Sequence, residues 1–412
     1  MKIIKNNNIS LIHLFFTFLK IGATSFGGFM ALISVVQNQL VTKDKIIDDE
    51  AILDGISLAS ILPGPVAVNF VTYIGFTFRG IRGALVSMSA VILPSFILML
   101  LLAYIYFTYG NIFYFSHFFK GVVPSVAAII LVVAATMAKK HIKNFKQLPI
   151  MVIAAFSVYF FKGFYTTFII IGIAGFIGTF LYSKEAYPFV IQKNRLKIIP
   201  FLHKTIDLIL AKKYKILIAL LFLLLILVIQ LFFIDLVTPY FRQLGQIFLT
   251  FSSISIFLFG GGYVFIPTIQ DVVVNQLQWL SSTEFVDAIA LGQVTPGPIL
   301  ISATFIGFKV SGLGGALVAT MAIFFPPALL TILLSKFYAT GKNFLIVEAI
   351  FKGIRPAVIG MIFSAVPIIF LSAESNMISI IIFLITAILA YQFKINAVVL
   401  IPLAGIIGII AL

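Results

Sequence analysis

The chain has 412 residues, of which 61% are hydrophobic and only 10% are charged, and its formal net charge is +15. This composition, with a mean hydropathy of +1.18, excludes a soluble globular domain and predicts an all-α polytopic membrane protein. The basic residues lie in short stretches between apolar segments, which is typical of membrane topology signals and not of nucleic-acid binding. The chain has no cysteine, which excludes disulfides and thiolate metal sites.

The first apolar run follows Lys5, continues past Lys20 through Phe26-Gly27-Gly28 and ends near Val36. It contains no small-residue cleavage site, so we interpret it as the first membrane segment and not as a signal peptide. A polar stretch, residues 37–50, separates this segment from the next.

The next apolar run, residues 56–78, is interrupted by Leu62-Pro63-Gly64-Pro65. Proline removes an amide donor and blocks the preceding helical turn, and glycine permits a sharp turn, so this run cannot form one smooth helix. In lipid, such a break is tolerated only where protein or a watery cavity satisfies the freed backbone groups. A kink or tight loop between ordinary helices is the alternative.

Further segments, at about 84–107, 119–138, 148–161 and 164–182, complete the first half. Residues 183–242 form a basic linker followed by a connecting transmembrane helix, because the run 216–234 is long enough to cross the bilayer. The positive-inside rule predicts that the basic part is cytoplasmic. A contact with lipid headgroups is the alternative for this part.

The second half repeats the first in order and in spacing. Phe259-Gly260-Gly261 matches Phe26-Gly27-Gly28, and Thr295-Pro296-Gly297-Pro298 matches the first Pro-Gly-Pro, both at a spacing of 233 residues. This agreement indicates an internal duplication, with a first transporter repeat at 1–182 and a second at 243–412. A broken helix at matching places in two halves indicates a transporter's binding site.

Counting segments predicts inverted repeats, because an odd number of crossings precedes the second copy. If both Pro-Gly-Pro segments cross the bilayer, the N-terminus is cytoplasmic, which is what we expect. If both are re-entrant, the N-terminus is outside. The distribution of Lys and Arg barely separates these two arrangements.

Charged side chains within the apolar segments are mostly basic: Lys20, Lys120, Lys352 and Arg355, against Asp54, Glu284 and Asp287. Such charges normally face a cavity or a partner. The basic excess, with helix N-termini expected just after both breaks, predicts an anionic substrate. Snorkelling is the alternative for Lys120 and Lys352. We interpret Asp54 and Asp287 as helix caps or ion-pair partners, and a role as proton carriers is the alternative.

The predicted substrate-binding residues are hydrogen-bonding groups and glycines around both breaks, together with the embedded arginine: Ser25, Gly27, Gly28, Ser60, Pro63, Gly64, Pro65, Asn69, Gly260, Gly261, Gly262, Gln293, Thr295, Pro296, Gly297, Pro298, Ser302 and Arg355. Neutral donors suit an oxyanion, although each could instead bond to its own backbone. The four histidines have no ligand spacing, so no metal, cofactor or enzymatic activity is predicted.

These motifs together resemble the chromate ion transporter family. The resemblance is carried by Phe26-Gly27-Gly28, Leu53-Asp54-Gly55, Leu62-Pro63-Gly64-Pro65, Phe259-Gly260-Gly261-Gly262, the stretch from Phe285 to Pro298, and the Lys-Gly-x-x-Pro elements at Lys120 and Lys352. It implies a two-domain transporter that exports chromate across a prokaryotic cell membrane, with sulfate as a competitor. Two positions depart from the family pattern: Phe29 stands where proline is frequent, and Ser60 stands where glutamine is frequent.

The expected partners are therefore a small inorganic oxyanion and the lipid bilayer, without nucleic acid, and a homodimer is left open. A passive anion channel would share the broken helices and the basic lining, and a different small anion is also compatible with them. A membrane-embedded enzyme is disfavoured, because it would need a catalytic or metal cluster.

Overall fold

The computed structural model describes residues 9–26, 28–109, 113–142, 144–161, 164–186, 239–257, 262, 265–338, 345–373 and 376–412. Within these ranges every regular element is a helix, which confirms the predicted all-α class. In the part of the chain that the structure describes, four helical stretches are long and apolar enough to cross a membrane: Val66–Tyr109, Ser116–His141, Ile299–Ser335 and Lys352–Phe370. Most of the predicted linker and its connecting helix, residues 187–238, lie outside the described residues.

The first half contains α1 (Leu11–Thr24), α2 (Gly28–Gln37), the π-helix η1 (Asn38–Lys43), α3 (Asp49–Ile61), α4 (Val66–Tyr109), α5 (Phe113–His141), α6 (Gln147–Phe160) and α7 (Phe164–Ala186). The second half contains α10 (Pro239–Phe257), α11 (Phe265–Gln270), the π-helix η3 (Asp271–Gln276), α12 (Ser282–Val294), the 3-10 helix η4 (Ile299–Ile301), α13 (Ser302–Tyr338), α14 (Leu345–Phe370), α15 (Met377–Tyr391) and α16 (Ala397–Ala411).

The first apolar run is two short helices, so the single membrane segment expected there is wrong. α1 ends at Thr24, and Ser25 has a non-helical backbone with φ −86° and ψ 73°. α2 begins three residues later, at Gly28. The glycine-containing motif between them ends one helix and starts another, because glycine stabilises a helix interior poorly.

The two halves repeat each other in local backbone detail. Each has a π-helical turn at the same place, η1 and η3, and each turn is followed by a non-glycine residue at positive φ, Lys45 at 53° and Gln278 at 50°. π-helical turns are rare, and non-glycine residues seldom adopt positive φ. Their occurrence at matching positions confirms that the halves share one fold.

α4 and α13 are both sharply folded back on themselves. In α4 the helical backbone is interrupted at Arg79 and Gly80, and in α13 at Ser311 and Gly312. Gly80 has φ 57° and ψ −142°, and Gly312 has φ 60° and ψ −145°. Glycine is required because these angles are closed to residues with a Cβ. Each long helix is therefore a short arm, a tight turn and a long arm.

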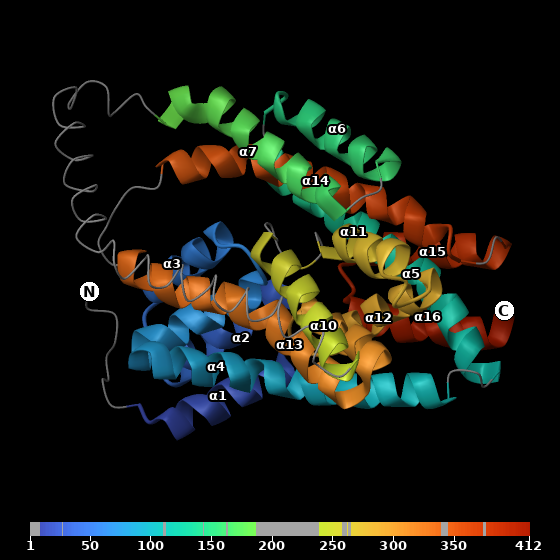
Figure 1. Ribbon diagram of the computed structural model, residues 1–412, viewed down its shortest axis with the longest axis horizontal. Helices are drawn as coiled ribbons and strands as arrows, with labels where there is room; N and C mark the ends of the chain where they lie inside the picture. The colour runs from blue at the N-terminus through green and yellow to red at the C-terminus, as the bar shows by residue number, and fades with distance from the viewer. Residues whose placement is uncertain are drawn as a thin grey trace.

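The halves are interlocked. α5 and α14 contact each other at the centre, α6 and α7 of the first half pack on α14, and α15 and α16 of the second half pack on α5 (Figure 1). α1 packs on α4, and α10 packs in the same way on α13. The long arms of α4 and α13 run in opposite directions, as do α5 and α14, which is the inverted arrangement expected from the segment count (Figure 1).

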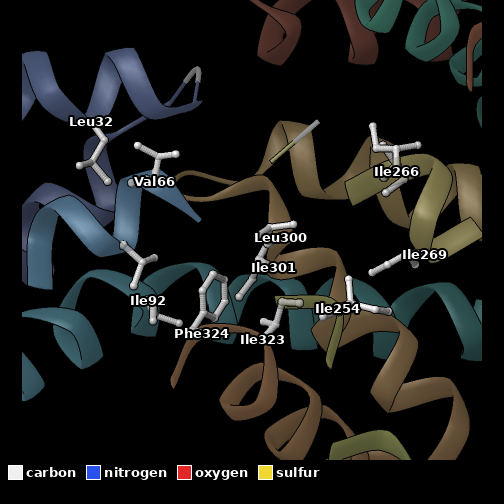
Figure 2. Packing of buried hydrophobic residues seen from close by; sticks show 14 of the residues in the cluster. Leu32, Val66, Ile92, Ile254, Ile266, Ile269, Leu300, Ile301, Ile323 and Phe324 are labelled. Carbon is white, nitrogen blue, oxygen red and sulfur yellow. The ribbon is translucent and has the colours of Figure 1, made fainter. Parts of the chain in front are cut away.

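One hydrophobic core joins the two halves. Figure 2 shows Val66 and Ile92 of the first half lying near Ile301 and Phe324 of the second, and all four belong to a single buried cluster. Many apolar side chains on the outer surface remain exposed, as expected for helices that face lipid. The breaks therefore lie inside packed protein.

We expect Gly312→Ala to destabilise the protein by about 1–3 kcal/mol, because its φ of 60° strains any residue with a Cβ. A Cβ at Gly312 would meet no atom within 4 Å, so the cost would come from the backbone alone. The loss would be measured as a lower melting temperature of the detergent-solubilised protein. Gly245→Ala is the matched control: its Cβ also meets nothing within 4 Å, but it lies inside α10, where alanine is the better helix former. Equal melting temperatures for the two variants would contradict the strained turn.

Candidate functional site

The first Pro-Gly-Pro turn lies between α3 and α4 and is fastened at both ends. The side-chain amide of Asn69, which is fully buried, donates to the carbonyl of Pro63 (Nδ2 to O 2.8 Å). Gly64 has φ 95°, and a Cβ there would collide with the ring of Pro327 in the second half. The turn is therefore held by a polar bond from α4 and by close contact with α13.

The second Pro-Gly-Pro turn, between α12 and η4, is held by the first half in the same way. Gly297 has φ 99°, and a Cβ there would collide with the Ser95 hydroxyl. The Ser95 hydroxyl donates to the carbonyl of Pro296 (2.5 Å), and the Gly297 amide donates to the carbonyl of Ser25 (2.8 Å). That amide is thus used inside the protein and is not available to a ligand.

The two Pro-Gly-Pro turns differ in the kind of helix that follows them. α4 begins directly after Pro65, as predicted, whereas Pro298 is followed by the 3-10 turn η4 before α13 begins at Ser302. The expected α-helical N-terminus immediately after Pro298 is therefore wrong. A 3-10 turn has poorer hydrogen-bond geometry than an α-helix, so the positive end expected there is weaker.

A cavity of about 500 Å³ lies beside the second turn. Its walls are the C-terminal part of α5, the end of α12 and the connection between α15 and α16. The lining residues are Ile129, Val132, Val133, Thr136, Lys139, Gly292, Gln293, Thr295, Gly297, Ile299, Ala390, Tyr391, Lys394, Ile395, Asn396 and Ala397. Both halves of the chain thus contribute to one cavity.

Gln293 is the buried polar side chain in this wall. It is 5% exposed, and neither its amide nitrogen nor its amide oxygen has a hydrogen-bond partner. Buried amide groups are nearly always paired, so an unpaired one at a cavity wall indicates a place for a ligand or water. Thr295 is also buried there, and its hydroxyl donates to the carbonyl of Gly292 (3.0 Å).

The charges on the cavity wall are positive. Lys139 lies in the last turn of α5, Lys394 lies in the connection between α15 and α16, and no acidic residue occurs among the described residues of the lining. α16 begins at the same wall, and its N-cap Asn396 makes no capping hydrogen bond with its side chain. A helix N-terminus carries partial positive charge, so lysines, amide and helix end all favour an anion.

Three of the predicted site residues, Gln293, Thr295 and Gly297, line this cavity. The hydroxyls of Ser25 and Ser302 are satisfied locally, by the carbonyls of Ile21 (2.6 Å) and Ile299 (3.2 Å). These two side chains therefore act in the structure as local backbone partners.

The predicted glycines and serine in the remaining motifs are less completely described. Gly27, Gly260 and Gly261 lie outside the described residues. Gly28 begins α2, and Ser60 lies near the end of α3. Gly262 lies against η4, since a Cβ there would come within 3.6 Å of Ile299.

The embedded arginine lies elsewhere. Arg355 lines a second cavity of about 370 Å³, together with Lys140, His141, Asn144, Gln147, Tyr182 and Lys352. Lys352 Nζ lies 5.8 Å from the centre of the Tyr182 ring. The structure does not bring Arg355 together with the lining of the first cavity, so a direct role beside the second turn stays a prediction.

The two embedded aspartates are not helix caps. Asp54 lies inside α3, whose N-cap is Asp48, and Asp287 lies inside α12, whose N-cap is Ser281. Asp287 is 3% exposed, and among the residues the structure describes it makes no ion pair. Its contact is the hydroxyl of Tyr106, which donates to Oδ2 (2.6 Å). The interpretation of Asp287 as a cap or ion-pair partner is therefore wrong.

Comparison with known families agrees with these observations. The family model described as "Chromate transporter" matches residues 12–179 and 245–409, which is most of the chain in two segments. The chain belongs to the chromate transporter family. This membership confirms the resemblance seen in the glycine and Pro-Gly-Pro motifs, and it assigns the protein to membrane transport of chromate-type anions.

Individual relatives of this transporter extend over nearly its whole length. An uncharacterized transporter of Methanocaldococcus jannaschii is 30% identical over 100% of this chain and 97% of its own. A chromate transport protein of Cupriavidus metallidurans is 28% identical over 96% of this chain and 91% of its own. A probable chromate transport protein of Synechococcus elongatus is 29% identical over 95% of this chain and 93% of its own. No solved structure matches the chain significantly.

Four polar residues of the cavity in this family member are not indicated by any sequence motif: Thr136, Lys139, Lys394 and Asn396. The two lysines look like ordinary loop charges, because each follows an apolar run near a helix end. The signal that could have found them is a pair of short polar stretches close to helix ends, at 136–141 and 392–396. Sequence does not show that these stretches meet.

We expect Gly297→Ala to reduce anion transport per molecule strongly while leaving membrane expression nearly unchanged. The φ of 99° would cost about 1–3 kcal/mol, and the colliding Ser95 hydroxyl can rotate away only by giving up its hydrogen bond to the Pro296 carbonyl, which disturbs the turn and not the rest of the fold. Gly64→Ala is the matched variant, and it should lower expression as well, because its Cβ meets the rigid ring of Pro327. Transport is normalised to protein measured by fluorescence-detected gel filtration. If Gly297→Ala lost expression and transport equally, the turn would be only a folding element.

Proposed function

We propose that this transporter exports chromate-type oxyanions from a prokaryotic cell and binds them in the cavity beside the second Pro-Gly-Pro turn. The observation that carries the proposal is the unpaired side chain of Gln293 in a wall whose described residues also include Lys139 and Lys394 but no acid. A ligand there would meet hydrogen-bond donors and positive charge. A tetrahedral oxyanion suits such a place, because each of its oxygens accepts hydrogen bonds and its negative charge is attracted to the lysines.

Sulfate is the expected competitor. Chromate and sulfate share tetrahedral shape and double charge, so lysines and amide donors recognise the two through the same contacts. Discrimination by a binding site is a difference between two affinities and needs a contact that only one ligand can make. Neither anion offers a group that the other lacks, which supports weak selectivity between them.

A passive anion channel is the alternative function. A channel and a transporter would both use a basic cavity, but only a transporter moves the anion against its electrochemical gradient. The test is uptake of labelled chromate by purified protein in proteoliposomes, with sulfate, molybdate and phosphate as competitors. Accumulation above the equilibrium value supports the transporter. Flux that stops at equilibrium would identify a channel, and no protein-dependent flux would reject the proposed function.

We expect Gln293→Leu and Lys139→Gln each to raise the apparent KM for chromate by about tenfold or more, because each removes a charge-assisted hydrogen-bond donor. Lys140→Gln is the matched control: it changes the same charge one residue later, on a side chain that lines the second cavity. Its KM should change much less. Equal effects of Lys139→Gln and Lys140→Gln would show that surface charge, and not the cavity, determines affinity.

A further inference from the structure

Asp287 is a buried carboxyl group with one polar contact. It is 3% exposed inside α12, and its Oδ2 accepts the hydrogen bond from Tyr106. Its other oxygen, Oδ1, is buried and has no hydrogen-bond partner. An ionised carboxylate normally collects several donors or a cation when it is removed from water. This carboxyl has the surroundings of a group that can hold a proton on Oδ1.

The charged groups around Asp287 do not supply a cation. One turn earlier on α12, Glu284 forms an ion pair with Lys309 of α13 (Oε1 to Nζ 2.8 Å). The Lys309 ammonium also lies 4.8 Å from the centre of the Phe107 ring. α5, which also packs on α12, carries Tyr114, His117, Lys120, Lys139, Lys140 and His141, and α4 carries Tyr73, Arg79, Arg82, Tyr104 and Tyr109 besides Tyr106. α11, η4 and α16 contribute no titratable side chain. Asp287 forms no ion pair with any of these groups within the described ranges.

Tyr106 connects this carboxyl to the other half of the chain. Tyr106 lies near the end of the long arm of α4, and its ring packs edge-on against Phe119 of α5 and Phe305 of α13, with centroids 5.1 Å apart in each case. The hydroxyl is thus aimed at Asp287 by a set of aromatic contacts. A hydrogen bond between α4 and α12 would change whenever the two halves move relative to each other.

The same helix leads from Asp287 to the anion cavity. Gln293 follows Asp287 by six residues on α12, a distance of about 9 Å along the axis. A negative charge on Asp287 repels an anion at this separation, particularly in a low-dielectric interior, and a neutral carboxyl does not. The protonation state of Asp287 and the occupancy of the cavity must therefore influence each other.

We propose that Asp287 and Tyr106 form a proton-binding site, coupled through α12 to the oxyanion cavity so that a proton and an anion bind the same state. This inference rests on the proposed function and deepens it by naming the coupled ion. The proton comes from water, binds Oδ1 and returns to water on the other side. Because coupling is reciprocal, proton binding raises anion affinity and anion binding raises proton affinity. One proton then moves with each anion, in the same direction.

The experiment uses the full chain in proteoliposomes that contain a trapped pH-sensitive dye. With the unmodified protein, a chromate gradient should move protons in the direction of chromate, and the apparent KM should fall by up to about tenfold per unit decrease in pH. Asp287→Asn should still exchange labelled for unlabelled chromate, but move no protons, and its KM should change less than about twofold over the same range. Chromate itself accepts a proton near neutral pH, so every trace is compared with protein-free vesicles and with Asp287→Asn.

Two further variants keep the test specific. Tyr106→Phe removes the donor that stabilises the ionised carboxyl, so the pH dependence of KM should move to higher pH while exchange at low pH is retained. Asp54→Asn, the matching position of the first half, should move protons as the unmodified protein does. Proton movement by Asp287→Asn, or loss of exchange in an intact and monodisperse Asp287→Asn protein, would overturn the proposal. Absence of exchange in the unmodified protein would instead reject the proposed function.

Discussion

Each Pro-Gly-Pro turn depends on a glycine at positive φ that lies against the opposite half of the chain. Gly64 packs on Pro327 and Gly297 packs on Ser95, and these two partners occupy matching positions in α13 and α4. A side chain on either glycine would have to occupy space already filled by the other half. The contact between halves therefore determines where two helices, α3 and α12, stop inside the protein, and it does so twice, by the same geometry.

This constraint explains why the cavity is composite. The second turn ends α12 in the protein interior, where α5 of the first half and the α15–α16 connection of the second half close around it. The backbone polar groups of the turn are partly satisfied by Ser25 and Ser95 of the first half. What remains for a ligand is the unpaired amide of Gln293 and the positive charge of the surrounding helix ends. The Tyr106 hydroxyl on Asp287 is another contact that joins the halves.

Much of the architecture could be predicted because glycine and proline act locally. Their spacing indicated the duplication and the breaks, the number of segments indicated the inverted repeats, and three of the residues named around the breaks, Gln293, Thr295 and Gly297, line the cavity. The rest depends on contacts between distant segments. Nothing local indicates that α6 and α7 pack on the helix of the other half, or that Lys394 lies near Lys139. The environment of Asp287 was misread for the same reason, since its partner Tyr106 is 181 residues away in the chain.

The exchange of the last helices between halves has an evolutionary consequence. Since α5 walls the cavity together with α12, α15 and α16, a symmetric pair of identical repeats would contain two equal cavities. Once the two repeats are fused into one chain, their sequences can diverge independently. At the position matching Lys139 the second half has Leu371, and at the position matching Gln293 the first half has Ser60. The position matching Lys394, however, keeps a lysine, Lys162, so the two halves have diverged in the amide and in one of the two lysines.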